Sequence, residues 1–508
     1  MVMKTIIIAV ASICIGLSAV AGEVNIVSFG AVADGKTINT KFIQSAIDKA
    51  NQDGGGTVIV PEGVFLTGSI VLKTGVELRL EKNAVLLGST NPFDYRGLNR
   101  WKALVLADGQ ENISITGKGT IDGQGRRLAL NVDSLFYIGE LDSVHYNLRR
   151  KRPNEHMRPQ NIEMVNCSNV KISEVTVKNA ACWVQTYDRC INLTIERIRV
   201  ESDAYWNNDG MDISDCKNVI ITGCYVNSAD DGICLKSHSA GYWNDNITIS
   251  DCTVRSSASA IKFGTASTGG FKNVKIENIK VFDTFRSAIA IESVDGGVLE
   301  NIEVNNINAA NTGNAIFIRL GHRNSDGPVG TLRNVTIKNV KAQIAFDRPD
   351  NDYDLRGPDL AFFHNPFPCT IAGIPGHNVE NVKLENIEIT FPGRGNNGLA
   401  YLPINRLNDV PEQKDEYPEF SMFGELPAWA FYVRHVNGLI LNNVVVKAEA
   451  PDYRPAFVFD DVKNLQLDKI SISKANNNPV LILKDVEGEK ISNVSVSGFD
   501  GEIIKTVK

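Results

Sequence analysis

Residues 206–236 read WNNDGMDISDCKNVIITGCYVNSADDGICLK and contain the repeat that decides the fold. Residues 209–213 (DGMDI) and 231–235 (DGICL) share one order: an acidic residue, a glycine, and two apolar residues separated by one position. The two copies start 22 residues apart, a spacing typical of successive turns of a coil of strands. The repeat therefore predicts that Asp209 and Asp231 lie on neighbouring turns, roughly 4.8 Å apart along the backbone.

A second repeat extends this pattern over most of the chain, because an asparagine followed by an apolar residue opens each short strand-like run. These pairs are Asn112-Ile113, Asn169-Val170, Asn192-Leu193, Asn218-Val219, Asn246-Ile247, Asn273-Val274, Asn301-Ile302, Asn334-Val335, Asn381-Val382 and Asn464-Leu465. No segment with helical periodicity interrupts the runs, and a propeller blade would need about 40 residues. The spacing predicts an all-β fold, a single right-handed parallel β-helix, with the asparagines stacked as a ladder at one turn.

The remaining segments fit around one such coil. Residues 1–22 contain Lys4, an apolar run and Ala19-Val20-Ala21, so they are predicted to be a signal peptide cleaved near Ala21. The protein would then be exported, to the periplasm or outside the cell, and residues 23–508 would form one β-helix domain. Its N-terminal cap, at about 23–60, would include an amphipathic helix starting near Thr40. Residues 349–375 and 392–430 break the period and are predicted to be long loops on one side.

The composition limits the kinds of molecule that the protein is expected to bind. The net charge of −7 and the pI of about 5.7 argue against binding to nucleic acid or to an anionic membrane. Nine cysteines include one in the predicted signal peptide, and none shows CxxC metal spacing. We expect the other eight to be buried thiols, with a Cys182–Cys190 disulfide as the less favoured alternative. We expect a monomer.

Strand alternation assigns the charged residues of the repeats to one outer face. The apolar positions of each repeat would face the core, and the positions between them would point outward. The outward residues of successive turns are Asp212, Lys236, Lys262, Glu292 and Arg319. Asp209, Asp230 and Asp231 would lie at the start of this face, where mutual repulsion should raise the pKa of at least one carboxyl. A single Asp-Gly pair is usually a turn, but three aspartates on adjacent turns beside cations favour a saccharide-cleaving site.

Three segments resemble the motifs of glycoside hydrolase family 28, the polygalacturonase family: residues 117–125 (GKGTIDGQG), 207–213 (NNDGMDI) and 228–237 (SADDGICLKS). The resemblance covers almost the whole mature chain. It implies that Asp230 is the general acid, that Asp209 and Asp231 activate the water, and that the anomeric centre is inverted. It also implies hydrolysis of a pectin-type polysaccharide, with no metal and no cofactor.

The chain departs from the family pattern at two motifs. The family's Gly-His-Gly falls on residues 258–260, where Ser259 replaces the histidine. Its Arg-Ile-Lys falls on residues 290–292, where Ala290 and Glu292 replace the cations that hold the substrate carboxylate. Lys262, with Lys236 and Arg319, is expected to supply the missing positive charge. The expected substrate-binding residues are therefore Asn207, Asp212, Lys236, Ser259, Lys262 and Arg319, although Asp212 could equally brace the turn.

These departures leave the substrate open between polygalacturonan and a decorated pectin such as rhamnogalacturonan, and the two long loops would favour exo action. Two other classes are weighed. A polysaccharide lyase on an acidic glycan would need a lysine or arginine base and often calcium, which the three aspartates could bind. A non-catalytic glycan-binding β-helix would bind without creating new reducing ends.

Overall fold

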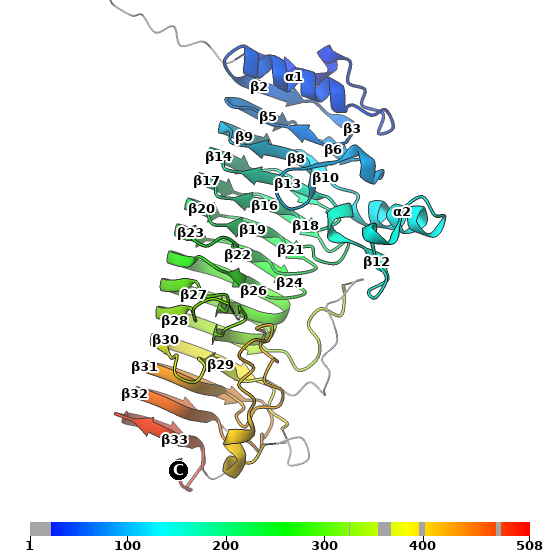
Figure 1. Ribbon diagram of the computed structural model, residues 1–508. Coiled ribbons are helices and arrows are strands. Elements are labelled where there is room, and N and C mark those ends of the chain that lie inside the picture. The colour runs from blue at the N-terminus through cyan, green and yellow to red at the C-terminus, as the bar shows by residue number, and fades with distance from the viewer. Residues whose placement is uncertain (1–21, 325, 354–366, 396–401, 474–478, 508) are drawn as a thin grey trace, which may run out of the picture.

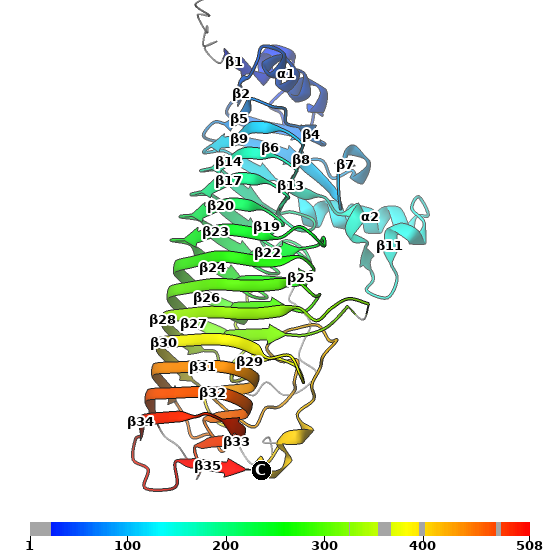
Figure 2. The same cartoon turned by 60° about the vertical axis from the view of Figure 1, so that its left-hand side comes forward.

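The computed structural model describes residues 22–324, 326–353, 367–395, 402–473 and 479–507, which wind into one elongated coil of stacked strands (Figures 1 and 2). The 33 strands of its main sheet pair in parallel, except where β7 (Arg96–Gly97) meets β8. The structure confirms the predicted all-β parallel β-helix. The signal peptide predicted for residues 1–22 lies almost entirely outside the described residues, and Gly22 begins strand β1.

Each turn of the coil contributes one strand to each of three parallel stacks. The first stack contains β4 (Ile70–Val71), β8 (Lys102–Asp108), β13 (Gln160–Val165), β16 (Gln185–Asp188), β19 (Met211–Ser214), β22 (Ile233–Ser237) and β25 (Ile261–Ser267). The second contains β1 (Gly22–Asn25), β2 (Gly56–Val60), β5 (Val76–Leu80), β9 (Glu111–Gly117), β14 (Ser168–Ser173), β17 (Ile191–Glu196), β20 (Lys217–Thr222) and β23 (Asn244–Ser250). The third contains β3 (Gly63–Thr67), β6 (Ala84–Gly88), β10 (Thr120–Asp122), β15 (Thr176–Lys178), β18 (Arg199–Ser202), β21 (Tyr225–Ser228) and β24 (Thr253–Ser256).

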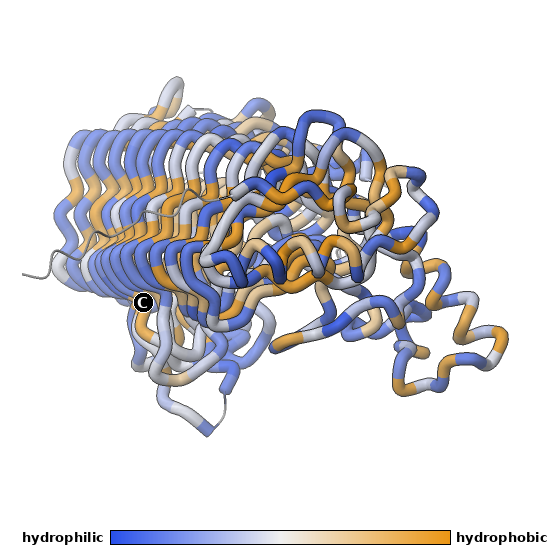
Figure 3. The backbone as a smooth tube through the Cα atoms, turned by 90° about the horizontal axis from the view of Figure 1, so that it is seen from above, coloured by the Kyte–Doolittle hydropathy of each residue, from blue (hydrophilic) through white to orange (hydrophobic). Residues whose placement is uncertain are grey.

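Beyond β25 most strands are longer and pass through the corners of the coil, as β26 does by pairing with β23, β24 and β25, whereas β29, β33, β34 and β35 stay short. They are β26 (Gly270–Ser293), β27 (Val298–Leu320), β28 (Thr331–Ile344), β29 (Cys369–Ala372), β30 (Val379–Phe391), β31 (Phe431–Ala448), β32 (Phe457–Ile472), β33 (Leu481–Glu487), β34 (Lys490–Val496) and β35 (Ile504–Val507). Viewed along the coil, hydrophobic residues line its interior and hydrophilic residues its rim (Figure 3). Burial of this continuous apolar interior is what holds the turns together.

The asparagine repeat forms the predicted ladder. The Asn192 amide donates to Asn169 (2.9 Å), Asn218 donates to Asn192 (3.0 Å), and Asn246 donates to Asn218 (2.9 Å). These residues also have positive φ, as in Asn218 (φ 57°), a conformation that asparagine tolerates better than most residues. A second set of ladder bonds, not foreseen from the sequence, has two parts: Asn306 donates to Asn278, and Asn443, Asn386, Asn339 and Asn305 follow one another as donor and acceptor.

Helix α1 (Thr40–Gln52) confirms the helix expected from Thr40 and lies at the N-terminal end of the coil (Figure 1). Its Ile43 and Ile47 side chains are buried in the main core. Asn39, the N-cap residue, makes no side-chain bond to the helix and instead accepts a hydrogen bond from the Val32 amide (2.7 Å). That α1 shields the open edge of the first turn stays a prediction.

An insertion between β10 and β13 corrects the expectation that no helix interrupts the repeats. It contains α2 (Gly125–Tyr137), η3 (Ser143–His145), β11 (Tyr146–Asn147), β12 (Arg152–Pro153) and η4 (Glu155–Met157). The insertion projects from the coil on the same side as the loop that leads into β31, in both views (Figures 1 and 2). These two segments therefore flank one face of the coil.

The two segments that break the repeat are not loops throughout. The first, 349–375, contains β29, which pairs with β27 and β31 and so belongs to the coil. The second, 392–430, contains η5 (Ile404–Asp409) and covers an apolar patch on the outside of the coil. That patch joins Phe317, Ala372, Tyr432, Val458 and Ile482 from the strands to Leu402, Leu407, Val410, Phe420, Phe423 and Leu426 from the loop.

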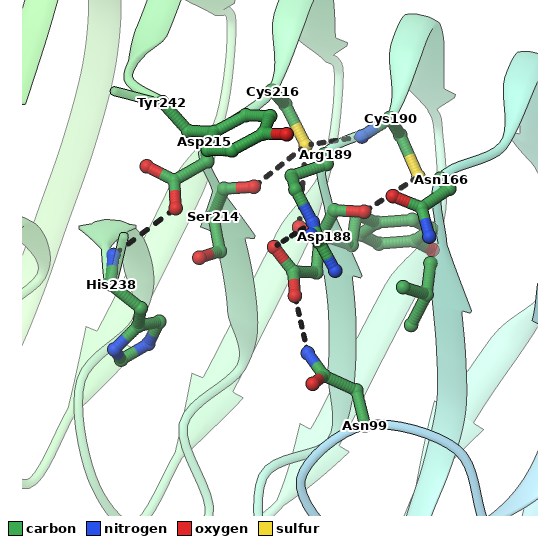
Figure 4. A network of polar contacts seen from close by, with 12 residues as sticks. Asn99, Asn166, Asp188, Arg189, Cys190, Ser214, Asp215, Cys216, His238 and Tyr242 are labelled. Carbon is green, nitrogen blue, oxygen red and sulfur yellow. Dashed lines mark hydrogen bonds and ion pairs between the residues drawn. The ribbon is translucent and has the colours of Figure 1, made fainter. Parts of the chain in front are cut away.

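The eight cysteines among the described residues are free and buried, as the sequence analysis favoured. Cys190 and Cys216 lie on successive turns, and the Cys190 amide donates to the Cys216 sulfur (3.3 Å; Figure 4). None of the described helices is both long and apolar enough to cross a membrane.

Candidate active site

Three aspartates come together where two neighbouring turns enter β19 and β22. The Gly210 amide donates to the Asp231 carbonyl (2.8 Å), so Asp209 and Asp231 occupy equivalent positions on adjacent turns, as predicted. One carboxylate oxygen from each of Asp209, Asp230 and Asp231 lies within 4.8 Å of the others. The predicted clustering of the three carboxyls is therefore confirmed.

The glycine after each aspartate makes this close approach possible. A Cβ atom on Gly210 would lie 2.6 Å from the carbonyl oxygen of Gly232 and 2.5 Å from a Val226 methyl group. Contacts this short would push the two turns apart. Gly210 therefore allows Asp209 to lie this close to Asp231.

Asp230 is anchored through its backbone carbonyl and borders the pocket. The hydroxyls of Ser228 (2.8 Å) and Ser256 (2.6 Å) both donate to its carbonyl oxygen. Its carboxylate accepts the Asp231 amide (3.0 Å) and borders the pocket described below. Asp230 is thus the member of the group that is held in place and also reachable from outside.

Lys236 lies beneath Asp209 and is shared between two acids. Its ammonium is 3.2 Å from Asp209 Oδ2 and 3.2 Å from Asp212 Oδ1, and it lies 4.7 Å from the centre of the Trp183 ring. Burial raises the pKa of Asp209 and of Asp212, the latter to about 7, because one ammonium cannot neutralise two buried carboxylates. As predicted, Asp212 and Lys236 lie close to the three aspartates, but both side chains are buried.

Lys262 lies beside Asp231, on the next turn. Its ammonium is 3.4 Å from Asp231 Oδ2 and 3.9 Å from Glu292 Oε2, and it donates to the Tyr417 hydroxyl (3.0 Å). Lys262 is only 1% exposed. These contacts occupy the ammonium group that was expected to meet the substrate.

The two adjacent aspartates are driven to opposite charge states. Burial raises the pKa of Asp230, and repulsion from Asp231 raises it further. Burial also acts to raise the pKa of Asp231, but Lys262 and Lys236 outweigh it and hold the pKa below the usual value. One proton donor and one charged base therefore stand side by side.

A pocket of about 520 Å³ opens onto Asp230. It is lined by Arg150, Arg152, Trp206, Asn207, Ala229, Asp230, Ser257, Ala258, Arg286 and Tyr417. Asn207, predicted to bind substrate, does line it, and the Asn207 side-chain oxygen accepts from Arg152 (3.2 Å) and Arg158 (3.0 Å). The pocket therefore has positive charge on both sides of a protonatable acid.

The other predicted substrate-binding residues lie below the pocket wall. The Ser259 amide donates to Asp231 Oδ1 (3.2 Å), and its side chain is buried. Arg319 donates to the carbonyls of Gly373 (2.8 Å), Glu412 (2.7 Å) and Gln413 (3.0 Å), so it anchors the covering loop. The outward-facing charges of the repeats do share one face, but the expectation that they meet the substrate there is corrected, because Asp212, Lys236, Lys262, Glu292 and Arg319 are all buried.

The sequence analysis missed most of the residues that line the pocket. Arg286 lies four residues before Ala290, the expected position of the family arginine, on the same strand β26, and its Nε lies 3.2 Å from Glu419 Oε2. An arginine four residues before the expected position was the only available signal. Tyr417, Arg150 and Arg152 belong to segments outside the repeat, so no periodicity could assign them to this site.

A parallel β-helix with an acid–base set of carboxyls at a pocket defines a polysaccharide-cleaving enzyme. Residues 52–346 match the model of glycosyl hydrolases family 28. The chain is 30% identical to a probable polygalacturonase of Vitis vinifera over 454 residues, which cover 80% of this chain and 84% of that relative. The chain therefore belongs to glycosyl hydrolases family 28 and is a glycosidase.

Other similar proteins include a further sequence relative and two solved structures. An exo-poly-alpha-D-galacturonosidase of Dickeya chrysanthemi is 26% identical over 387 residues, covering 64% of this chain and 63% of that protein. Two solved exopolygalacturonases share the fold. The one from Thermotoga maritima has a TM-score of 0.59 and 24% identity, over 73% of this chain and 87% of that chain. The one from Yersinia enterocolitica has a TM-score of 0.58 and 19% identity, over 95% and 79%.

Proposed function

We propose that this protein is an exported, monomeric, inverting glycosidase that hydrolyses bonds in a pectin-type polysaccharide, polygalacturonan or rhamnogalacturonan. The observation that carries the proposal is the placement of Asp230, whose carboxyl has a raised pKa and borders the pocket, directly beside the charged Asp231. Such a pair supplies the proton donor and the base that glycoside hydrolysis needs.

The reaction follows from these charge states. Asp230 gives its proton to the glycosidic oxygen as the bond to the anomeric carbon breaks. A water held by Asp231 and Asp209 attacks that carbon and passes its proton to Asp231. Lys262 and Lys236 touch these carboxylates, so their proposed contribution is to position and charge them as well as to favour an acidic substrate.

The stereochemistry has to be measured directly. Inversion is proposed because the family resemblance implies it. The closest oxygens of the three carboxyls, within 4.8 Å, are nearer than the roughly 6.5–9.5 Å between the carboxyl groups of typical inverting pairs. Proton NMR of the first product formed would show the inverted anomer, and the retained anomer would contradict this part of the proposal.

We further propose exo action, because two segments outside the repeat reach into the pocket and restrict it. Tyr417, from the loop before β31, reaches Lys262, while the insertion after α2 brings Arg150 and Arg152 to the pocket. Relatives named exo-poly-alpha-D-galacturonosidase and exopolygalacturonase support this mode. Release of one small product from the start, with slow loss of viscosity, is expected, and rapid loss of viscosity would contradict it.

The central experiment is the release of reducing sugar from a panel of purified pectins. We expect new reducing ends, no ultraviolet-absorbing unsaturated product, and no loss of activity in a chelator. An unsaturated product would indicate a lyase, and binding without new reducing ends would indicate a glycan-binding protein. Export is tested by fractionating expressing cells, and the monomer by light scattering.

A further inference from the structure

Four consecutive cationic residues lie at one side of the pocket. Arg149, Arg150 and Lys151 form the exposed turn between β11 and β12, and Arg152 follows in β12. Arg150 and Arg152 line the same pocket as Asp230. This basic turn, residues 149–152, is unexpected in a chain of net charge −7, and no motif of the resemblance includes it.

The basic turn has a defined shape. The Arg150 amide donates to the side-chain oxygen of Asn147 (2.9 Å), which closes the turn. Tyr146 stacks on Phe136 of α2, with ring centres 4.1 Å apart and planes 2° apart, so the hairpin is fixed to the helix. The cations therefore lie on a hairpin that packs against α2.

Arg152 is already oriented toward the pocket. Its guanidinium lies 5.3 Å from the centre of the Trp206 ring and donates to Asn207 Oδ1 (3.2 Å). The residue is 8% exposed, and its buried Nε has no hydrogen-bond partner among the described residues. An unpartnered, buried donor beside a pocket is a group that an incoming acceptor would satisfy.

The positive charge here exceeds the acidic charge that could balance it. Glu155 is shared, at 3.5 Å from Arg152 and 3.0 Å from Arg158. Over the described part of the chain, no ion pair involves Arg149, Arg150 or Lys151. The turn is therefore ready to accept an anion from solution.

We propose that the basic turn binds the carboxylate of a second acidic sugar, on the far side of Asp230 from Arg286. This inference rests on the proposed function and deepens it. With a cation on each side of the proton donor, the cleaved bond joins two acidic sugars. An alternating chain, in which a neutral sugar follows each acidic one, would leave one side unpaired.

The test uses the full chain with Arg150→Gln and Lys151→Gln together, because both side chains are exposed. Lys280→Gln with Lys341→Gln is the matched control, since these lysines are exposed on the coil far along the sequence. We expect the KM for polygalacturonan to rise about tenfold or more in the first variant, with a smaller change in kcat. Equal KM values in the two double variants would overturn the proposal.

A binding measurement separates this inference from the proposed function. In an Asp230→Asn background, calorimetry with a galacturonate oligomer should show about tenfold weaker binding when the basic turn is neutralised. The methyl-esterified oligomer should bind equally to both forms. If neutralising the basic turn weakens the binding of both oligomers equally, the turn does not recognise the carboxylate charge, whatever the outcome of the activity assays.

Discussion

The ammonium group of Lys262 lies 3.4 Å from Asp231 Oδ2, across adjacent turns of the coil, and helps to decide which of two neighbouring acids is charged. The pKa of Asp231 is lowered because Lys262, with Lys236, overcomes the effect of burial. The pKa of Asp230 is raised by burial and by the negative charge of Asp231. The proposed catalytic roles therefore depend on a lysine whose side chain is buried.

Asp230→Asn should abolish turnover of the natural glycan and preserve the fold. Asparagine has nearly the same shape but cannot protonate the leaving oxygen, and general acid catalysis typically contributes roughly 10²–10⁴-fold. On an activated aryl glycoside, which needs little protonation, this variant should keep much of its activity, whereas Asp231→Asn should not. Equal losses of both variants on both substrates would show that the roles are assigned wrongly.

Lys262→Met should move the acid limb of the pH dependence of kcat/KM to higher pH. Lys262 lowers the pKa of Asp231, so without the lysine this base becomes protonated at a higher pH and activity is lost earlier on acidification. Glu292→Gln is the control. Burial raises the pKa of Glu292 to about 8, so it is already neutral at the pH of that limb and the limb should not move.

The Lys262 variant must also be checked for folding, since removing one partner of a buried ion pair costs about 3–5 kcal/mol. Thermal unfolding of both variants provides that check. An acid limb that stays in place in a folded Lys262→Met protein would mean that Lys262 does not set the ionisation of Asp231.

Arg286→Gln should raise the KM for an acidic substrate by about tenfold or more, because a contact with a charged group contributes roughly 1.5–3 kcal/mol. Arg286 lines the pocket and is oriented by Glu419, while the side chain of Lys262 is covered. Arg286→Lys should recover part of the affinity, because lysine restores the positive charge but cannot form the two parallel hydrogen bonds of a planar guanidinium group. The same KM increase on fully esterified substrate would exclude recognition of a carboxylate.

Asn218→Ala should destabilise the coil more than Asn218→Gly. Both changes remove the two ladder hydrogen bonds of Asn218, to Asn192 and from Asn246. Alanine must also adopt φ near 57°, which costs about 1–2 kcal/mol and which glycine tolerates. Urea denaturation measures the difference, and equal stabilities would show that positive φ is not the constraint at this position.

Much of the fold and the clustering of Asp209, Asp230 and Asp231 were determined by the sequence alone. A repeat such as that at Asp209 and Asp231 specifies its own register, because each turn pairs with the turns before and after it and apolar side chains must keep facing inward. The asparagine ladder follows from the same local rule. Arg286 also belongs to the repeat, on the same strand as residues 290–292 but four residues before the position to which the motif pointed.

The rest of the pocket was decided by the tertiary structure. Tyr417 meets Lys262 across 155 residues, and the basic turn comes from an insertion with no counterpart in the repeat. The loop that contains Glu412 and Tyr417 covers Lys262 and Arg319, and the Trp183 ring lies against Lys236, although strand alternation alone would expose all three cations. Alternation tells which way a side chain points from its own strand, but only the packing of distant loops decides whether solvent or protein lies there.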